Sequence, residues 1–370
     1  MSISYNITNY SDTFSNIILI NGLNPDRLKR RYGWIFNANI KDAIIGESNN
    51  KLIWYTGDWL SGYWDNGVWY SGNFHSGEWN DGLWYSYKLD KRQLLQNNIR
   101  FLEKENEQNS KFINGIWRKG TFYNGQFGTD IKKDWSSDNF ISIINNQPRW
   151  EDGIFRKGTF KNATWLNGSF LNGYFFNSQW IDGSFFNGIF EGHTWWDGSF
   201  TGGDFIEGNW YDGIFTQINS NLKSRFGSST ISGKTCIWYD GNFNNGEIHS
   251  NLNSISGYTD ISINNEYTIW ANGNFNNGKW FGGSWLDGNF NNGYFYNGIW
   301  SGGTFNNGHI YNIIYYNGVF NNGYLRNGNI NGGDFYKGYI GFEKNEIKIK
   351  EKDTSINITT NLKINNVSNL

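Results

Sequence analysis

Large apolar side chains recur every five residues along most of this chain. From Trp150 to Phe215, every fifth residue is Phe or Trp. A second register three residues later holds Gly at most positions, with Ala163, Ser178 and His193 as exceptions. The residue before this Gly is usually Asn, Asp, Gly or Ser. The repeating unit is therefore an aromatic residue, any residue, Asn or Asp, Gly, and any residue.

A period of five residues suits neither a helix nor a long flat strand. In a helix, residues five apart differ by about 140° around the axis, so the rings would spiral over every face. In a flat strand, an odd spacing places successive rings on opposite faces. A chain that turns at every Asn-Gly or Asp-Gly step satisfies the pattern, because each short extended segment then points one ring inward.

The same unit recurs in five blocks, so we expect an all-β repeat solenoid rather than a domain with one central core. Its length is set by the number of units that stack. The expected solenoid spans residues 54–342, between an N-terminal cap or docking segment and a strand-rich C-terminal tail. The blocks cover residues 54–84, 112–127, 150–215, 238–248 and 270–340; the insertions cover 86–111, 128–149, 216–237 and 249–269; the ends cover 1–53 and 343–370.

The unit resembles that of the pentapeptide-repeat proteins, which fold as right-handed, four-sided β-helices. In that family the central residue of each five points inward, and so does a small residue two positions before it. Here Gly153 precedes Phe155 and Gly168 precedes Phe170 in this way. The chain departs from the family by using Phe and Trp where Leu is commoner, and Gly where Ala, Ser or Thr is commoner. The resemblance implies a four-sided solenoid with these rings in its core: Trp54, Trp59, Trp64, Trp69, Phe155, Phe160, Trp165, Phe170, Phe185, Trp210, Phe275, Trp280, Phe290 and Trp300.

A second resemblance gives an alternative fold. The segments Tyr55-Thr-Gly-Asp-Trp59 and Tyr70-Ser-Gly-Asn-Phe74 are similar to the core of MORN repeats, which stack as β-hairpins. Asn-Gly is also a strong hairpin-turn signal. MORN units are much longer than five residues, so the four-sided solenoid is the leading prediction and a hairpin meander is the alternative.

The insertion at 86–111 predicts one helix. Leu95, Ile99 and Leu102 follow helical spacing among charged neighbours. Two interpretations stay open, a surface helix packed on the solenoid wall and a docking helix for another subunit. The three later insertions have similar lengths, which favours similar loops leaving the same kind of corner, where binding often resides.

The N-terminal segment carries a basic cluster. Asn24 and Pro25 predict the start of a short helix that bears Arg27, Lys29, Arg30 and Arg31. The plain interpretation is a solvated helix face, and the alternative is a contact with an acidic partner. Further along, Trp34 and Phe36 are expected to cap the first coil. At the other end, alternating residues such as Ile347 and Ile349 predict a strand that caps the last coil or pairs with another chain.

Charge and cysteine content limit the partners. The chain has 31 Lys and Arg against 33 Asp and Glu, a net charge near −2, so we expect no general nucleic-acid binding. Cys236 is the only cysteine, which excludes an intrachain disulfide and a multi-cysteine metal site. We also expect no secretory signal and no membrane-spanning segment.

Sequence motifs for catalysis are not found. The four histidines fall in separate parts of the repeat, and no metalloprotease, phosphate-loop or nucleophile-elbow motif occurs. Several Asp residues, such as Asp152 and Asp182, all hold the position before Gly, which favours a turn role over cation or sugar binding. We therefore predict no enzyme activity, no cofactor and no metal.

These features lead to three hypotheses about function. The first is a non-enzymatic structural protein of a virus particle, namely a tail, baseplate or fibre component of a tailed phage, located in the virion. It rests on the repeat and on a composition rich in Asn, Ile and Tyr. The second is a cytoplasmic or surface-displayed interaction scaffold of a cell. The third is a carbohydrate-binding or carbohydrate-active β-helix. The expected partners are other structural subunits, including copies of this chain, with a glycan as the alternative.

Overall fold

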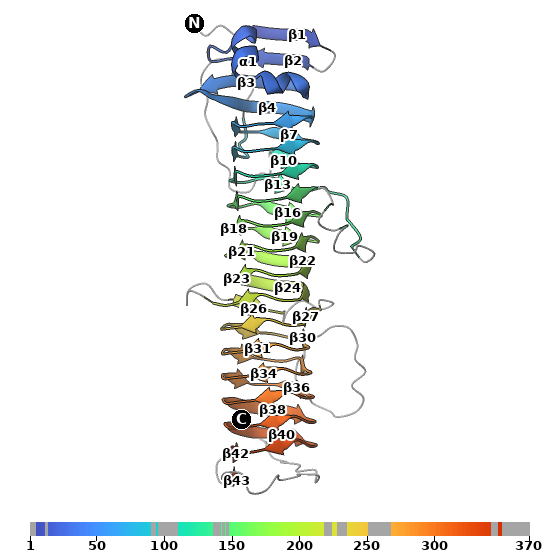
Figure 1. Cartoon of the computed structure of the whole chain (residues 1–370), viewed down its shortest axis with the longest axis vertical. Coiled ribbons are helices and arrows are strands. Elements are labelled where there is room, and N and C mark those ends of the chain that lie inside the picture. Colours follow the sequence, from blue (N-terminus) through green and yellow to red (C-terminus); the bar gives the residue numbers. More distant parts are fainter. Residues whose placement is uncertain are drawn as a thin grey trace. The chain divides into compact units, whose positions relative to one another are not determined.

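The computed structural model describes residues 5–11, 14–89, 94, 110–135, 142, 145, 148–217, 224–227, 235–250, 268–341 and 347–349. The chain divides into two compact units, Met1–Gly188 (unit 1) and Ile189–Leu370 (unit 2). The framework of each unit is a set of short strands that lie one above the next in parallel ladders (Figure 1). The predicted all-β repeat solenoid is confirmed.

Each coil contains three of the five-residue repeating units, which we call pentads. Where no insertion intervenes, every ring pairs with the ring 15 residues later, as Trp150 pairs with Trp165 and Phe155 with Phe170. The prediction of four sides is therefore wrong. The hairpin meander is wrong as well, because the repeat strands pair in parallel; among the described residues, antiparallel pairs occur only near the two chain ends.

The packing of the inward rings explains why the coil has three sides. The rings of successive sides meet edge to face: Trp150 and Phe155 have centroids 5.9 Å apart at 76°, and Phe155 and Phe160 are 6.1 Å apart at 85°. Along the stack, Trp150 lies parallel to Trp165 at 4.9 Å. A coil of four pentads would place Trp150 against Phe170, whereas a coil of three places like rings on like rings. Both arrangements of aromatic pairs are favourable ones.

In unit 1 the strands form three sides, named A, B and C. The strand β4 (Lys51–Ser61) turns from side A to side B. Side A continues with β6 (Val68–Trp69), β9 (Leu83–Trp84), β12 (Thr121–Phe122), β15 (Ile154–Phe155), β18 (Ser169–Phe170) and β21 (Ser184–Phe185). Side B continues with β7 (Gly72–Phe74), β10 (Ser110–Phe112), β13 (Gln126–Phe127), β16 (Thr159–Lys161) and β19 (Tyr174–Phe176). Side C has Trp as its inward residue throughout and contains β5 (Tyr63–Trp64), β8 (Glu78–Trp79), β11 (Ile116–Trp117), β14 (Arg149–Trp150), β17 (Thr164–Trp165) and β20 (Gln179–Trp180).

In unit 2 the three sides are named D, E and F. Four longer strands turn the corner from E to F: β22 (Ile189–Trp195), β24 (Gly203–Trp210), β38 (His309–Tyr315) and β40 (Tyr324–Ile330). Side D contains β23 (Ser199–Phe200), β25 (Ile214–Phe215), β28 (Asn242–Phe243), β31 (Asn274–Phe275), β34 (Asn289–Phe290), β37 (Thr304–Phe305), β39 (Val319–Phe320) and β41 (Asp334–Phe335). Side E adds β26 (Ser224–Phe226), β29 (Glu247–Ile248), β32 (Lys279–Trp280), β35 (Tyr294–Phe295) and β42 (Gly338–Ile340), and side F adds β27 (Cys236–Trp238), β30 (Thr268–Trp270), β33 (Ser284–Trp285) and β36 (Gly298–Trp300).

The corner glycines are required by close backbone contact. Gly168 has φ +113°, and a Cβ built there would lie 2.5 Å from the carbonyl oxygen of Gly153, its equivalent one coil earlier. A side chain at this position would be strained by both its φ and that contact. The glycine thus lets successive coils approach each other, in addition to marking the corner.

The predicted turn role of the Asp residues is confirmed. Asp152 accepts a hydrogen bond from the backbone N–H of Gly153 at 2.7 Å. Asp81, Asp197 and Asp240 accept the same bond from the glycine that follows each of them. These short side chains fix the corner conformation locally, as Asp commonly does in turns.

The described N-terminal elements precede the first coil. They are β1 (Tyr5–Ser11), β2 (Phe14–Leu19), α1 (Pro25–Arg31), the 3₁₀ helix η1 (Gly33–Asn37) and β3 (Asn39–Ser48). The predicted helix start is confirmed, because the Asn24 side chain accepts the N–H of Arg27 at 2.8 Å. The Trp34 ring packs against Trp64 at 5.2 Å and against Trp59 at 6.2 Å. Trp34 therefore covers the first rings of the interior, as expected of a cap.

The described part of the C-terminal tail forms the strand β43 (Ile347–Ile349). It pairs antiparallel with β42, with Ile347 opposite Ile340. The expected strand is confirmed at these residues, and it pairs with its own chain.

One prediction about the insertions needs correction. Segment 216–237 is not a single loop, because it contains β26, whose Phe226 pairs with Phe205 and continues the inward row of side E. The irregular spacing around Phe226 hid this unit from the five-residue pattern. The similar lengths of the later insertions therefore do not indicate similar loops.

Candidate functional site

The predicted core rings lie in the interior. All of them are fully buried: Trp54, Trp59, Trp64, Trp69, Phe155, Phe160, Trp165, Phe170, Phe185, Trp210, Phe275, Trp280, Phe290 and Trp300 have no exposed surface. Within each unit they stack on equivalent rings of the neighbouring coils, as Trp285 does on Trp300 at 4.8 Å. Because the rings fill the inside, binding chemistry has to be sought on the outer faces and corners.

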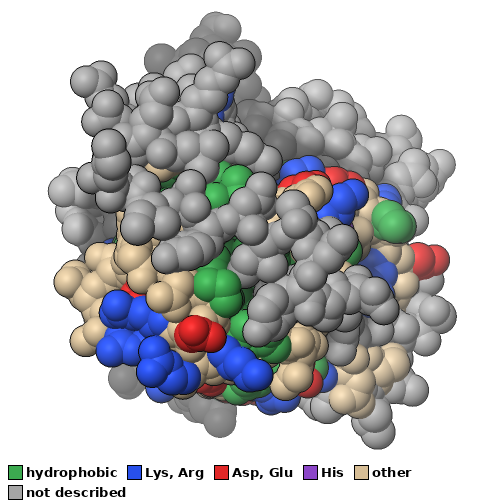
Figure 2. Space-filling view, turned by 90° about the horizontal axis from the view of Figure 1, so that it is seen from above, with side chains coloured by type: hydrophobic (Ala, Val, Ile, Leu, Met, Phe, Trp, Pro, Cys, Tyr) green, Lys and Arg blue, Asp and Glu red, His purple; other side chains and the backbone are tan. Residues whose placement is uncertain are grey.

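The basic cluster of α1 is partly neutralised within the chain. Arg27 Nε and Arg31 Nη1 each lie 2.5 Å from a carboxylate oxygen of Glu47, which is buried. Burial by itself raises the pKa of Glu47, but the hydrogen bonds and charges of the two arginines outweigh it and lower that pKa below its usual value. Figure 2 shows a group of Lys and Arg side chains at the lower left of this view with an acidic side chain among them, and a second group of mixed charge at the upper right. Lys29, Arg30 and Arg31 are exposed, although Arg31 also contacts Glu47.

The insertion at 86–111 is described at residues 86–89, 94, 110 and 111. Leu95, Ile99 and Leu102 lie outside the described residues. Their neighbour Leu94 is buried, and it belongs to an apolar cluster on the outer surface of unit 1 with Ile20, Ile44, Ile53, Tyr55 and Val68. At Leu94 the insertion therefore packs on the wall of its own unit.

Insertion residues also contact the corner between sides B and C. Asn162 donates to the Thr129 carbonyl at 2.7 Å, Asn177 donates to the Lys133 carbonyl at 3.0 Å, and Trp135 Nε1 donates to the Asn177 carbonyl at 2.9 Å. Asn162 and Asn177 have positive φ and occupy equivalent corners of successive coils. This explains why Ala163 and Ser178 replace glycine there: in each case the preceding Asn takes the left-handed conformation and binds the loop.

A row of outward side chains runs along side E of unit 2, each one directly before an inward residue. We call it the side E row. Its members pair in register from one strand to the next: Asp204, Arg225, Glu247, Lys279, Tyr294, His309, Tyr324 and Tyr339. The first four alternate in charge and the last four are rings. The row therefore changes from ionic to aromatic between Lys279 and Tyr294.

Ion pairs join the charged members. Arg225 Nε lies 2.6 Å from Asp204 Oδ1, and this hydrogen bond raises the pKa of the arginine further. Glu247 lies between His249 Nε2 at 3.2 Å and Lys279 Nζ at 4.0 Å. Such pairs at the surface contribute little stability, about 0–1 kcal/mol each, but they leave this stretch close to electrically neutral.

The rings of the row stack on one another. Tyr294, His309, Tyr324 and Tyr339 follow at centroid distances of 5.1, 4.9 and 5.0 Å, with planes within 9° of parallel. Burial, together with the nearby Arg326, lowers the pKa of His309 below its ordinary value. His309 is therefore neutral at pH 7 and acts as one more ring in the stack.

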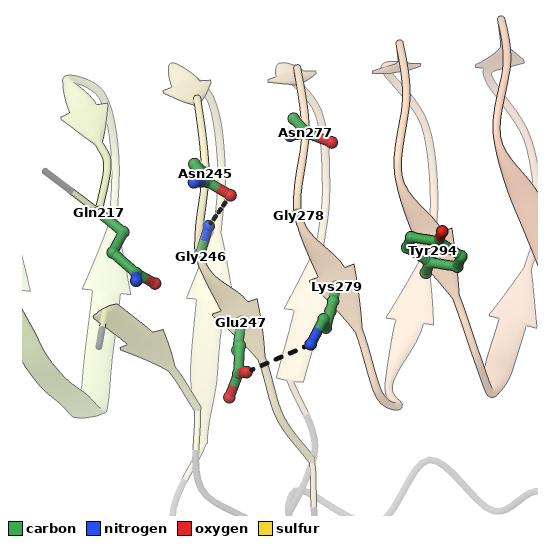
Figure 3. Close-up of a pocket in the computed structure, with 8 residues that line it drawn as sticks. All are labelled: Gln217, Asn245, Gly246, Glu247, Asn277, Gly278, Lys279 and Tyr294. Atoms are coloured by element: carbon green, nitrogen blue, oxygen red, sulfur yellow. Dashed lines mark hydrogen bonds and ion pairs between the residues drawn. The ribbon is translucent and has the colours of Figure 1, made fainter. Parts of the chain in front are cut away.

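A pocket of about 290 Å³ lies where the row changes character, beside the corner between sides D and E (Figure 3). It is lined by Gln217, Asn245, Gly246, Glu247, Asn277, Gly278, Lys279 and Tyr294. We call it the corner pocket. Figure 3 shows Lys279 and Glu247 pointing toward each other, with the two corner asparagines side by side and the Tyr294 ring on the adjacent strand.

The corner pocket provides hydrogen-bonding groups but no pair of catalytic carboxylates. Glu247 is the only carboxylate among its lining residues, whereas most glycosidases use two. Within the described part of the chain, no three His, Cys, Asp or Glu side chains lie close enough to hold a metal ion. In the same residues, no helix has the length and apolar character needed to cross a membrane.

The five-residue pattern does not predict the corner pocket or the side E row. The signal was present, because Tyr294, His309, Tyr324 and Tyr339 recur every 15 residues directly before an inward residue. In the five-residue repeat, each of these four residues occupies a position where any residue is allowed, so their relationship is not visible at that period. The candidate residues that the sequence did suggest, Arg27 to Arg31, lie in unit 1 and form no part of this pocket.

Comparisons with known protein families, with curated proteins and with solved structures found no match for this chain. The pentapeptide-repeat and MORN families therefore remain resemblances of pattern.

Proposed function

We propose that this chain is a structural and interaction protein without catalytic activity, and that it is a tail, baseplate or fibre component of a tailed-phage particle. The observation that carries the proposal is the ring-filled interior. In both units, inward aromatic residues are fully buried and contact rings on the other sides and in the neighbouring coils. Such an interior suits a stiff support that presents its outer surface to partners.

Two further features support this function. The loop residues Thr129 and Lys133 are held to their corner by hydrogen bonds from Asn162 and Asn177, so the scaffold fixes the segment that leaves it. The composition also fits a particle protein that needs no disulfide, since Cys236 is the only cysteine and is buried. Its expected partners are other structural subunits, including copies of this chain.

The test is to purify particles from the source of this sequence on a density gradient and to identify their proteins by mass spectrometry. The proposal expects this chain in the particle band, at a constant ratio to the other structural proteins. Its absence from particles, together with its presence in the host-cell fraction, would contradict the assignment and favour a cellular scaffold.

A further inference from the structure

The aromatic part of the side E row begins at Tyr294, which stacks on one neighbour of the row and lies beside Tyr296, two residues along the chain, at 5.7 Å, with ring planes 8° apart. Tyr324 lies between His309 and Tyr339, with centroids 4.9 and 5.0 Å away, so neighbouring rings cover both of its faces. Tyr294 stacks on His309 at 5.1 Å, but on its other side the row continues with Lys279, which has no ring. Tyr294 is 41% exposed and lines the corner pocket.

The corner asparagines of the pocket differ from those of later coils. Asn322 donates to Asn307 at 3.3 Å, and Asn307 donates to Asn292 at 3.5 Å, so these amides bind one another along the corner. Asn245 uses its Oδ1 to accept the N–H of Gly246 at 3.0 Å. Asn277 is exposed and makes no side-chain hydrogen bond to any described residue. The amides at the pocket are therefore open to a ligand.

The charges at the pocket cancel. Glu247 and Lys279 face each other across 4.0 Å, and Glu247 also contacts His249. The side chain of Glu247 is 19% exposed and that of Lys279 is 50% exposed, so both reach solvent at the pocket. A strongly charged ligand would have to separate this pair. A ligand with hydroxyl groups can instead donate to the carboxylate and accept from the ammonium group.

We propose that the corner pocket binds one hexose unit of a neutral glycan. The Tyr294 ring packs against the C–H face of the sugar, since the negative face of an aromatic ring attracts the partial positive charge of C–H groups. Asn245 and Asn277 bind the hydroxyl groups at the corner, and Glu247 with Lys279 binds those at the opposite wall. The size of the pocket is at the small end for ligand sites, about 300 Å³, which suits a single sugar ring.

The site binds the glycan without cleaving it, because its lining contains a single carboxylate. This inference does not depend on the presence of the chain in a virus particle. A glycan site would serve a particle protein and a cellular scaffold equally well.

The test uses the full-length protein and three neutral oligosaccharides of different linkage: maltohexaose, cellohexaose and chitohexaose. Saturation-transfer NMR detects binding, and isothermal titration gives the affinity for any oligosaccharide that binds. We expect binding of at least one of them, in a form that sodium chloride does not weaken, because no net charge is involved. Failure of all three to bind would overturn the proposal.

The decisive variant is Tyr294→Ala, with Tyr324→Ala as its matched control. Both remove a tyrosine from the same row, but only Tyr294 lines the pocket. Tyr294→Ala should weaken binding about tenfold, which is ~1.4 kcal/mol, and Tyr324→Ala should leave affinity unchanged. Equal affinity in the wild type and the Tyr294 variant would place the glycan elsewhere and overturn the proposal.

A second pair of variants tests the corner amides. Asn277→Ala should weaken binding by roughly threefold to tenfold, as expected for the loss of one neutral hydrogen bond. Asn322→Ala, at the equivalent corner away from the pocket, should have no effect. Because Asn277 is exposed and makes no hydrogen bond within the described chain, its variant is expected to fold normally. Circular dichroism and the melting temperature verify this for all four variants.

Discussion

Outward aromatic rows occur in both units, and among the described residues they differ in how deeply their rings are buried. In unit 1, Tyr55, Tyr70 and Tyr85 follow the inward residues of side A and lie 5.7 Å apart. Leu94 of the insertion packs into their cluster, and Tyr55 is only 3% exposed. In unit 2, Tyr294 at the start of the aromatic part of the side E row remains 41% exposed.

This difference shows that the repeat determines where rings line up, and that the interruptions determine what the rings do. A covered row becomes a second core on the outside of the coil and contributes to stability. An uncovered row contributes less to stability, and its open end is available to a ligand. The two rows therefore predict different responses to the same substitution.

The largest expected effect is the loss of a covered tyrosine. Tyr55→Ala removes a buried ring and leaves Asn21 without the hydroxyl that accepts its hydrogen bond at 2.7 Å. It should lower the free energy of unfolding by about 3–5 kcal/mol, measured by urea titration. Tyr294→Ala should lower it by about 1 kcal/mol or less. Equal losses at the two positions would contradict the division into covered and uncovered rows.

The second prediction removes the cover instead of the row. Leu94→Ala should destabilise unit 1 by about 2–3 kcal/mol, because Leu94 is buried against Ile44, Ile53 and Val68. Hydrogen exchange should then become faster in β4 and β6 than in the strands of unit 2. Leu286→Ala is the control, since Leu286 is 45% exposed. An unchanged exchange rate at β4 would show that the insertion does not protect the row.

The third prediction concerns pH. Burial, aided by the neighbouring Tyr70, raises the pKa of Tyr55 to about 12 in the folded chain, although the Asn21 hydrogen bond opposes the shift. The unfolded chain ionises this phenol near pH 10. The Tyr55 phenol makes its full contribution to the free energy of unfolding below pH 10. This contribution is lost as the pH rises toward 12, which lowers the free energy of unfolding by up to about 2–3 kcal/mol. Urea titrations at pH 9 and pH 12 should show this loss, and Tyr55→Phe should reduce it.

The smallest expected effect is on the half-buried amide ladder of side D. Asn306 donates to Asn291 at 2.7 Å and accepts from Asn321 at 2.7 Å. Asn306→Ala removes both bonds and should cost about 1 kcal/mol, whereas Asn321→Ala removes one and should cost about half as much. Thermal unfolding monitored by circular dichroism measures both. A loss as large as that of Tyr55→Ala would mean that this amide ladder stabilises the coil as strongly as the buried ring of Tyr55 does.

The sequence predicted the elements that depend on one pentad and missed those that depend on the coil. A ring that points inward, a Gly at a corner and an Asp that binds the next N–H are local features. The number of sides depends on the stacking of rings, and the relevant signal was the recurrence of Trp at 150, 165, 180, 195 and 210. Fifteen residues per turn places Trp on Trp, and twenty would not.

Other features could not be read from a period at all. Phe226 belongs to the inward row, but the segments on both sides of it break the spacing. Tyr55 shares its buried cluster with Leu94, which lies in an insertion with no repeat of its own, and its hydroxyl binds Asn21 of the N-terminal segment. The corner pocket forms where the side E row changes from Lys279 to Tyr294, which occupy the same position in two neighbouring coils. Its existence follows from the number of sides, which the period of five does not determine.

Three pentads make one coil, and engineered disulfides between neighbouring coils can verify this number. In a Cys236→Ser background, Ile154→Cys and Ser169→Cys place cysteines at paired positions of neighbouring coils. Disulfides require Cα atoms about 4.4–6.8 Å apart. In a three-sided coil this pair cross-links under mild oxidation. The pair Ile154→Cys with Tyr174→Cys, which a four-pentad coil would bring together, does not. Rapid cross-linking of the 154–174 pair, with none of the 154–169 pair, would contradict the three-sided coil.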